Sequence, residues 1–221
     1  MNPFVDKLSP EKKAIVTSIH QHADRIMSQT PRFLYFTLHN SEHFSNLFNI
    51  ATLLEEGGLK FNETERYYLS ISICIHDLGM CLGLTEKTRE DILLGSSDSN
   101  DYALIENFVR DNHHEMVDDW ISTNFDFLSN LGISPADLGI LSKISKCHRK
   151  IPLKNQNGII KKLGSILRVI DELDITPSRA PQDTFKNMYP QMDSIARWHW
   201  FKHNIVDNWI QDHNVFYETK S

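Results

Sequence analysis

Apolar residues recur at helical spacing along most of the chain, and this pattern predicts an all-α fold. One clear stripe contains His43, Leu47, Ile50 and Leu54, which fall on a single face of a helix. The segment 67–75 is apolar on all sides, which is typical of a helix at the centre of a fold. We therefore expect the other helices to pack around that segment.

Capping patterns mark where several helices begin. Segments 9–12, 62–65 and 134–137 each join a Ser or Asn cap to an acidic residue, and two of them place proline in the first turn. The segment 102–124 is also helical in pattern, either continuous or broken near Asn112. These signals give most of the expected helix boundaries.

The same pattern divides the chain into three parts. We expect an N-terminal helical extension (1–32), a helical core (33–180) and an aromatic-rich tail (181–221) that packs on the core. Within the tail, 205–210 and 215–218 alternate as short strands do and predict a small β-hairpin. The predicted fold is thus an all-α helical core with a small C-terminal β-hairpin.

The segment 67–80 ends in an adjacent histidine and aspartate after an apolar run. Its sequence is YYLSISICIHDLGM, in which His76 and Asp77 follow the buried stretch and Gly79 lets the chain turn away. Burying a polar group without a partner costs about 2–7 kcal/mol, and an ion costs more. A divalent metal compensates, because it binds neutral imidazole nitrogen and carboxylate oxygen together.

Other apolar stripes also end on or contain a single polar group. Each histidine alone is more simply interpreted as a hydrogen-bonded core residue. As a set, however, groups from five separate helices indicate one shared polar centre. Of the adjacent His113 and His114, only one can face inward. The candidate ligands are His43, His76, Asp77, His114, His148 and Asp171.

The composition of this candidate set bears on the metal. Nitrogen and oxygen ligands without cysteine favour Zn, Fe, Mn, Co, Ni or Mg over an iron–sulfur cluster. More than four ligands suit octahedral coordination or two ions about 3.5–4 Å apart. We therefore expect one or two divalent ions.

Charge and composition narrow the class of protein further. The hydrophobic content of 40% and charged content of 24% are ordinary for a globular protein, and the formal net charge of −6 argues against a surface built wholly for nucleic acid. The segment 143–162 nevertheless holds seven Lys or Arg and no acid. Such a run is usually a solvated face, but beside a metal it attracts phosphate.

Features tied to cellular compartment point to the cytoplasm. Three cysteines without a CxxC pattern indicate reduced thiols. No apolar run reaches the length of a membrane span, and the N-terminus lacks the plan of a signal peptide. We expect a cytoplasmic protein without membrane association.

The ordered ligand set resembles the HD-domain metal-dependent phosphohydrolase superfamily. The resemblance runs through His43, His76-Asp77 and Asp171, the H…HD…D signature of that superfamily, and spans about residues 33–180. Segments HNSEHFSNLFNIA, ISICIHDLGM, RDNHHEM, KISKCH and LRVIDELDITPSR resemble its ligand-bearing helices. The ending HD-(L/I)-G-M is similar to HD domains of CRISPR-type nucleases and of large multidomain prokaryotic proteins.

The resemblance implies roles for these residues. His43, His76, Asp77 and Asp171 would hold a first metal, with Asp77 able to bridge. His114 and His148 would hold a second metal or bind the phosphate. His114 is preferred over His113 because it directly precedes Glu115, as in a related HE pattern. Asp77 and His114 are the expected catalytic residues.

The implied chemistry is hydrolysis of a phosphate ester or anhydride. The metal lowers the pKa of a bound water to about 7, and Arg110, His148, Arg168 and Arg179 are expected to bind substrate. The substrate is a nucleotide, a cyclic nucleotide or single-stranded nucleic acid. The alternative is a nucleotide-binding regulatory module with little turnover.

Two further expectations concern segments outside the ligand set. The polar stretch 85–101 is either a mobile lid over the site or a plain connector. The aromatic residues of the tail pack the core, or offer a surface for a second copy of the chain or a partner domain.

Overall fold

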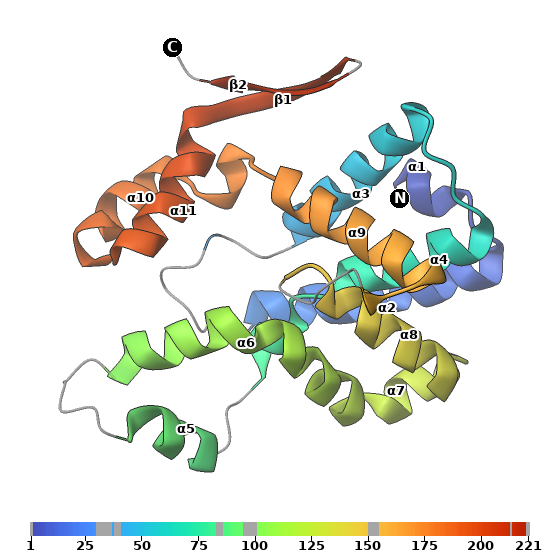
Figure 1. The fold of residues 1–221 in the computed structure, drawn as a ribbon, viewed down its shortest axis with the longest axis horizontal. Helices are drawn as coiled ribbons and strands as arrows, with labels where there is room; N and C mark the ends of the chain where they lie inside the picture. The colour runs from blue at the N-terminus through green and yellow to red at the C-terminus, as the bar shows by residue number, and fades with distance from the viewer. Residues whose placement is uncertain are drawn as a thin grey trace.

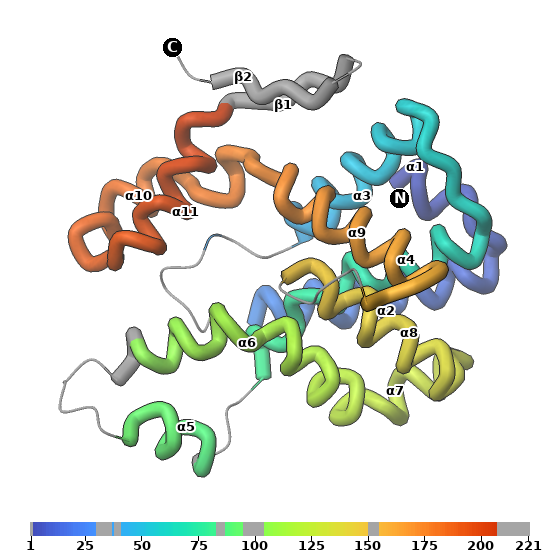
Figure 2. The backbone as a smooth tube through the Cα atoms, viewed as in Figure 1, coloured from blue at the N-terminus to red at the C-terminus, as the bar shows by residue number. Residues whose placement is uncertain are grey.

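Helices make up almost the whole of the computed structural model (Figure 1). Figure 2 traces the backbone, and the structure describes residues 2–29, 37, 41–82, 86–94, 101–149, 155–212 and 214–219, with side chains in all of these except 101–103 and 207–219. The helices are α1 (Pro3–Asp6), α2 (Pro10–Gln29), α3 (Ser41–Glu56), α4 (Glu63–Ile75), α5 (Glu86–Leu93), α6 (Asp101–Thr123), α7 (Phe125–Asn130), α8 (Pro135–Lys146), α9 (Gly158–Leu173), α10 (Gln182–Met188) and α11 (Ser194–Ile205). Short 3₁₀ turns are η1 (Leu78–Cys81), η3 (Pro177–Arg179) and η4 (Tyr189–Gln191). The prediction of an all-α core is confirmed.

Two of the predicted capping patterns form as capping boxes. The Asn62 side chain accepts a hydrogen bond from the Glu65 backbone N–H, and the Glu65 carboxylate accepts one from the Asn62 backbone in return. Ser134 and Asp137 make the same exchange at the start of α8.

Helix α6 runs unbroken through Asn112, so the alternative of a break there is excluded.

Helix α4 lies at the centre of the main hydrophobic core. Its residues from Tyr67 to Ile75 are all buried, and α2, α3, α8 and α9 pack against it (Figure 1). Phe4 and Ile19 place α1 and α2 in the same core. A helix buried on every side carries the His76-Asp77 pair to the middle of the molecule.

A second, smaller hydrophobic cluster holds α10 and α11 together. Trp200 is buried and stacks on Phe185 at a ring-centroid distance of 6.0 Å. Ala180, Met192 and Ala196 are the other buried members of the cluster, and α11 also packs on η3. This packing fixes α11 beside the turn that follows α9.

The chain ends in the hairpin that the sequence predicts. Strands β1 (Val206–Asp212) and β2 (Asn214–Thr219) pair antiparallel, with Trp209 opposite Tyr217. Trp198 on α11 is 61% exposed. The side chains of Trp209 and Tyr217 lie outside the described residues, so the tail as a partner surface stays a prediction.

The stretch 85–101 contains helix α5. The lid hypothesis also concerns residue 85 and residues 95–100, which lie outside the described residues. The three cysteines Cys74, Cys81 and Cys147 are free thiols. Among the described residues, none of the helices combines the length and apolar character that a membrane-spanning segment needs.

Candidate metal centre

The histidine and aspartate after α4 face one centre because the helix ends between them. His76 is the C-terminal cap of α4, and Asp77 precedes η1. Their side chains are almost fully buried, and His76 Nε2 lies 3.1 Å from Asp77 Oδ2. Adjacent residues within a regular helix point about 100° apart. The α-helix ends at this point, and the change in backbone conformation at Asp77 lets the side chains of His76 and Asp77 converge.

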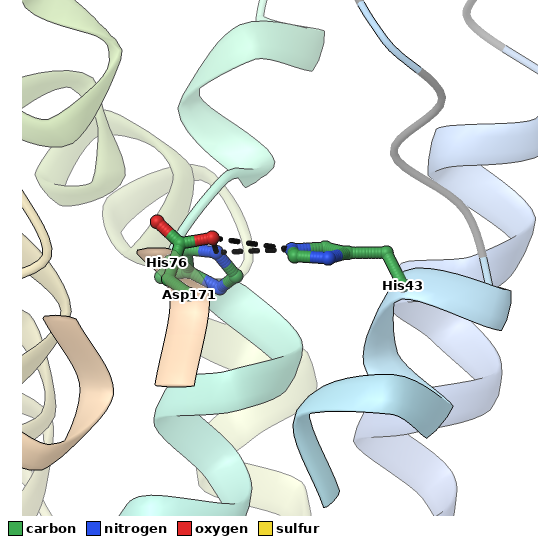
Figure 3. Close-up of side chains that lie close together, drawn as sticks. All are labelled: His43, His76 and Asp171. Atoms are coloured by element: carbon green, nitrogen blue, oxygen red, sulfur yellow. Dashed lines mark hydrogen bonds and ion pairs between the residues drawn. The ribbon is translucent and has the colours of Figure 1, made fainter. Parts of the chain in front are cut away.

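The first group of ligand atoms joins helices α3, α4 and α9. His43 Nε2 lies 3.5 Å from His76 Nε2 and 3.6 Å from Asp171 Oδ1, and these three residues converge so closely that they could hold one ion. In Figure 3, His43 reaches from one side toward His76 and Asp171 on the other. Asp77 Oδ2 faces the same point, 3.8 Å from His43 Nε2.

The second group of ligand atoms lies around Asp77 Oδ1, the other carboxylate oxygen of the same residue. His113 Nε2 and His148 Nε2 are each 3.4 Å from Asp77 Oδ1, and they lie 3.0 Å from each other. Asp77 therefore bridges the two groups, with one carboxylate oxygen toward each. This arrangement matches a site for two divalent ions that share a bridging carboxylate.

The second nitrogen of each ring fixes its orientation. The Nδ1–H groups of His76 and His148 donate to the backbone carbonyls of Ile73 and Ser145, at 3.0 and 2.6 Å. That of His113 donates to a carbonyl one turn earlier in α6. A carbonyl can only accept, so Nδ1 carries a hydrogen and Nε2 is the atom that presents a lone pair when the ring is neutral. Metal-bound histidines are typically held in this way.

His43 is oriented by a carboxylate instead. Its Nδ1 lies 2.7 Å from Asp174 Oδ2, and Asp174 also accepts from Asn46 at 2.9 Å and pairs with Arg179 at 3.5 Å. Burial favours protonation of Asp174, but His43 and Arg179 outweigh it and lower the pKa of this carboxyl. An ionised Asp174 thus aims the Nε2 atom of His43 at the centre.

The electrostatics of the two groups fit a bound cation. Burial opposes a charge on His76, but Asp77 and Asp171 outweigh it and raise its pKa to about 10. Burial, and then His76, lowers the pKa of His148 to about 3. The carboxylate charge that holds a proton on His76 would equally attract a cation in its place, with release of that proton, and the ring of His148 is already neutral, as a metal ligand must be.

Gly79 brings the second group close to the first. A Cβ atom at this position would overlap the backbone carbonyl oxygen of His113 and lie 3.0 Å from the Cβ atom of Met116. Gly79 does not have a positive φ. Its role is therefore close approach between η1 and α6, in addition to the turn that the sequence suggested.

The comparisons with known proteins agree with this centre. The HD-CE family model matches residues 33–219, which include every residue of both groups. The chain belongs to the HD-CE family. The resemblance to the HD superfamily is thereby confirmed. No curated protein and no solved structure gives a significant match.

Both histidines of the adjacent pair on α6 are buried, contrary to the expectation that only one faces inward, and the one that reaches the metal centre of this HD-CE domain is His113. His114 Nε2 lies 3.6 Å from Glu115 Oε1, and the second group consists of Asp77, His113 and His148. Packing of η1 on α6 at Gly79 turns His113 toward Asp77. The geometry therefore favours His113 for the position that the sequence assigned to His114.

A pocket opens from the metal centre of the HD-CE domain. Asp77, His113, His148 and Asp171 lie at its wall, and the side chain of Asp171 is 20% exposed. The remaining lining residues are Thr37, Met80, Arg110, Arg149, Glu172, Asp174, Arg179, His199, Lys202 and His203. Ligand atoms and cationic side chains thus face one space.

The expected substrate-binding residues divide between this pocket and the surface. Arg110, His148 and Arg179 line the pocket. Arg168 is exposed and donates to the backbone carbonyl of Arg149 at 2.8 Å, so it does not line the pocket in the described structure. Arg168 lies on the outer face of α9.

Several pocket residues were not singled out from the sequence. Arg149 belongs to the basic segment 143–162, and among the described Lys and Arg residues of that segment it is the one that lines the pocket. His199, Lys202 and His203 lie at i, i+3 and i+4 of α11. That spacing puts three polar residues on one helical face, which is a signal the sequence does contain.

Proposed function

We propose that this HD-CE domain is a metal-dependent phosphohydrolase that cleaves phosphate esters of a nucleotide, a cyclic nucleotide or single-stranded nucleic acid. The observation that carries the proposal is Asp77, whose two carboxylate oxygens face two separate histidine groups. A structural core has no need for four buried imidazoles whose Nε2 atoms converge on shared carboxylate oxygens, whereas a metal centre requires that arrangement.

The donor set fits divalent ions. Every atom that faces the centre is an imidazole nitrogen or a carboxylate oxygen, which suits Mn, Fe, Co, Ni, Zn or Mg. His43, His76, Asp77 and Asp171 would hold a first ion. Asp77, His113 and His148 would hold a second, or the two histidines would contact the phosphate if one ion binds. When bound, such ions lower the pKa of water and neutralise charge on phosphoryl oxygens.

The protein's own groups perform the remaining tasks. Asp174 keeps His43 in the ligating orientation. Arg110 and Arg179 place positive charge in the pocket, where it would orient a phosphate and offset charge that develops during hydrolysis. Burial of the centre excludes bulk water, which strengthens these interactions.

Metal analysis with matched variants tests the proposal. We expect about one to two divalent ions per chain in the native protein, loss of metal in His76→Ala and Asp77→Ala, and hydrolysis of a generic phosphodiester or a nucleotide that depends on both residues. Metal without turnover on a panel of nucleotides and single-stranded oligonucleotides would favour a nucleotide-binding regulatory module. No metal under any loading condition would contradict the proposal.

A further inference from the structure

Four cationic side chains reach the pocket from four separate segments. Arg110 lies on α6, Arg149 follows α8, Arg179 belongs to η3, and Lys202 lies on α11. These four segments are well separated in the sequence. Packing of α11 on η3 brings Lys202 to the same space as the metal centre.

The charges of the described lining residues decide what the pocket can hold. The four carboxylates of Asp77, Asp171, Glu172 and Asp174 match the four Lys and Arg residues in number, and Glu106, behind the wall, pairs with Arg110 at 3.5 Å and adds one more negative charge. Burial, followed by neighbouring cations, lowers the pKa of His199 to about 4 and that of His203 to about 3, so both are neutral at pH 7. One bound divalent ion therefore leaves about one uncompensated positive charge, and two bound ions leave about three.

An internal phosphodiester carries one negative charge, which leaves this surplus partly unmatched. A terminal phosphate carries about −1.5 to −2 at pH 7, and a polyphosphate carries more. With two bound ions, a terminal phosphate or a polyphosphate thus matches the surplus better than a phosphodiester does. The charge balance favours a substrate with at least two negative charges.

Lys202 is the cation in the pocket that is most available to pair with a substrate anion. Its side chain is partly buried, and it makes no hydrogen bond or ion pair with the residues that the structure describes. Arg179, by contrast, pairs with Asp174, and Arg149 donates to the Arg110 carbonyl at 3.0 Å. Glu172 and Asp171 favour the charged form of Lys202, but burial outweighs them and lowers the pKa of the ammonium. An anion in direct contact with this partly buried ammonium relieves that cost of burial.

We infer that Lys202 and His199 of α11, together with Arg149, form an anion subsite next to the metal centre, and that the substrate bears a terminal phosphate or polyphosphate. The subsite rests on the proposed function, since it serves the metal centre described above. Helix α11 then selects among phosphate compounds by charge. Lys202 is a specificity-determining residue, distinct from the metal ligands.

Calorimetry with two matched probes tests the subsite without requiring turnover. Phenyl phosphate is a dianion near pH 7.5, whereas diphenyl phosphate is a monoanion with the same ring chemistry. Binding of each to the Mn²⁺-loaded full chain is compared for the native protein, Lys202→Gln, Lys202→Arg and Lys186→Gln. Lys186 is exposed on α10 and does not line the pocket, so its variant removes the same charge elsewhere.

We expect the native protein to prefer phenyl phosphate. Lys202→Gln weakens that binding about tenfold, as loss of one charge-assisted hydrogen bond does, and changes binding of diphenyl phosphate less than twofold. Lys202→Arg restores most of the affinity, and Lys186→Gln leaves it unchanged. Metal content is measured in every variant and stays at the native level.

Two outcomes overturn the subsite. One is native affinity of Lys202→Gln for phenyl phosphate, and the other is an equal loss in Lys186→Gln. Hydrolysis of p-nitrophenyl phosphate and bis(p-nitrophenyl) phosphate is followed in parallel. Lys202-dependent binding without hydrolysis of either ester supports the subsite and contradicts the proposed catalysis. If Lys202→Gln hydrolyses both esters at the native rates, the result supports catalysis and overturns the subsite.

Discussion

The Nε2 atoms of His113 and His148 lie 3.0 Å apart in a buried site. Each ring donates its Nδ1–H to a backbone carbonyl, so two lone pairs point toward each other and toward Asp77 Oδ1. When both rings are neutral, the two lone pairs repel at this distance, and a cation between them turns repulsion into coordination. This relationship gives the second ligand group a specific test.

Replacing each member of the adjacent pair on α6 separates their roles. We expect His113→Ala to weaken binding of one metal ion by more than about 100-fold, because changes outside the direct ligands already cost 10–100-fold. His114→Ala is the matched control and retains the native metal content. The measurement is metal titration of both variants, with thermal unfolding to confirm that each is folded. Greater metal loss in His114→Ala would restore the assignment made from the sequence.

Gly79→Ala tests the close approach between η1 and α6. The added methyl group meets the His113 carbonyl, so η1 must move away and Asp77 moves with it. We expect a loss of about 1–3 kcal/mol in the free energy of unfolding, the usual cost of overpacking. We also expect weaker metal binding at the second group.

Gly139→Ala on α8 is the control for that substitution. A Cβ atom there meets nothing within 4 Å, and replacing a helical glycine by alanine is expected to stabilise the protein by about 0.5–1 kcal/mol. Urea unfolding gives both values. Equal stability of the two variants would mean that η1 does not depend on close contact with α6.

The sequence predicted the ligand-bearing helices well because local signals define them. Capping boxes at Asn62 and Ser134 are formed within four residues, and the burial of α4 follows from its uniformly apolar sequence. The choice between His113 and His114 could not be made in this way. It depends on how α6 rotates against η1, which the close packing at Gly79 determines.

The basic wall of the pocket was only partly predictable for a similar reason. Arg149 lies in a conspicuous basic segment, but Lys146 and Lys162 in that segment pair with surface acids instead. Lys202 reaches the pocket because α11 packs through Trp200 and lies on η3. Such contacts between distant segments have no signature in either segment alone.

Asp174→Asn tests the residue that orients His43. The amide retains the shape of the carboxylate but loses the charge that holds the Nδ1–H of His43. We expect metal affinity at the first group to fall 10–100-fold, as is usual when such a partner is changed. Asp126→Asn, at an exposed position on α7, should leave affinity unchanged. Unaltered metal binding in Asp174→Asn would exclude a role for Asp174 in orienting His43.

The pH dependence of stability tests the environment of His203. This buried residue donates its Nδ1–H to the Thr176 carbonyl at 3.2 Å, and burial, followed by Arg179 and Lys202, lowers its pKa to about 3. Between the unfolded pKa of about 6.5 and pH 3, the unfolded chain binds a proton at this position that the folded chain does not. Stability contributed by neutral His203 is therefore present above pH 6.5 and is lost as pH falls.

His203→Gln removes this titration while retaining a side-chain donor. Relative to the native protein, we expect the fall in unfolding free energy to be shallower by up to about 1.4 kcal/mol per pH unit between pH 6 and pH 4.5, the value for one proton. Urea unfolding at several pH values, with metal removed from both proteins, gives the difference. Other histidines and the carboxylates contribute to both curves alike and cancel. Parallel curves would show that His203 accepts its proton as readily in the folded protein as in the unfolded chain.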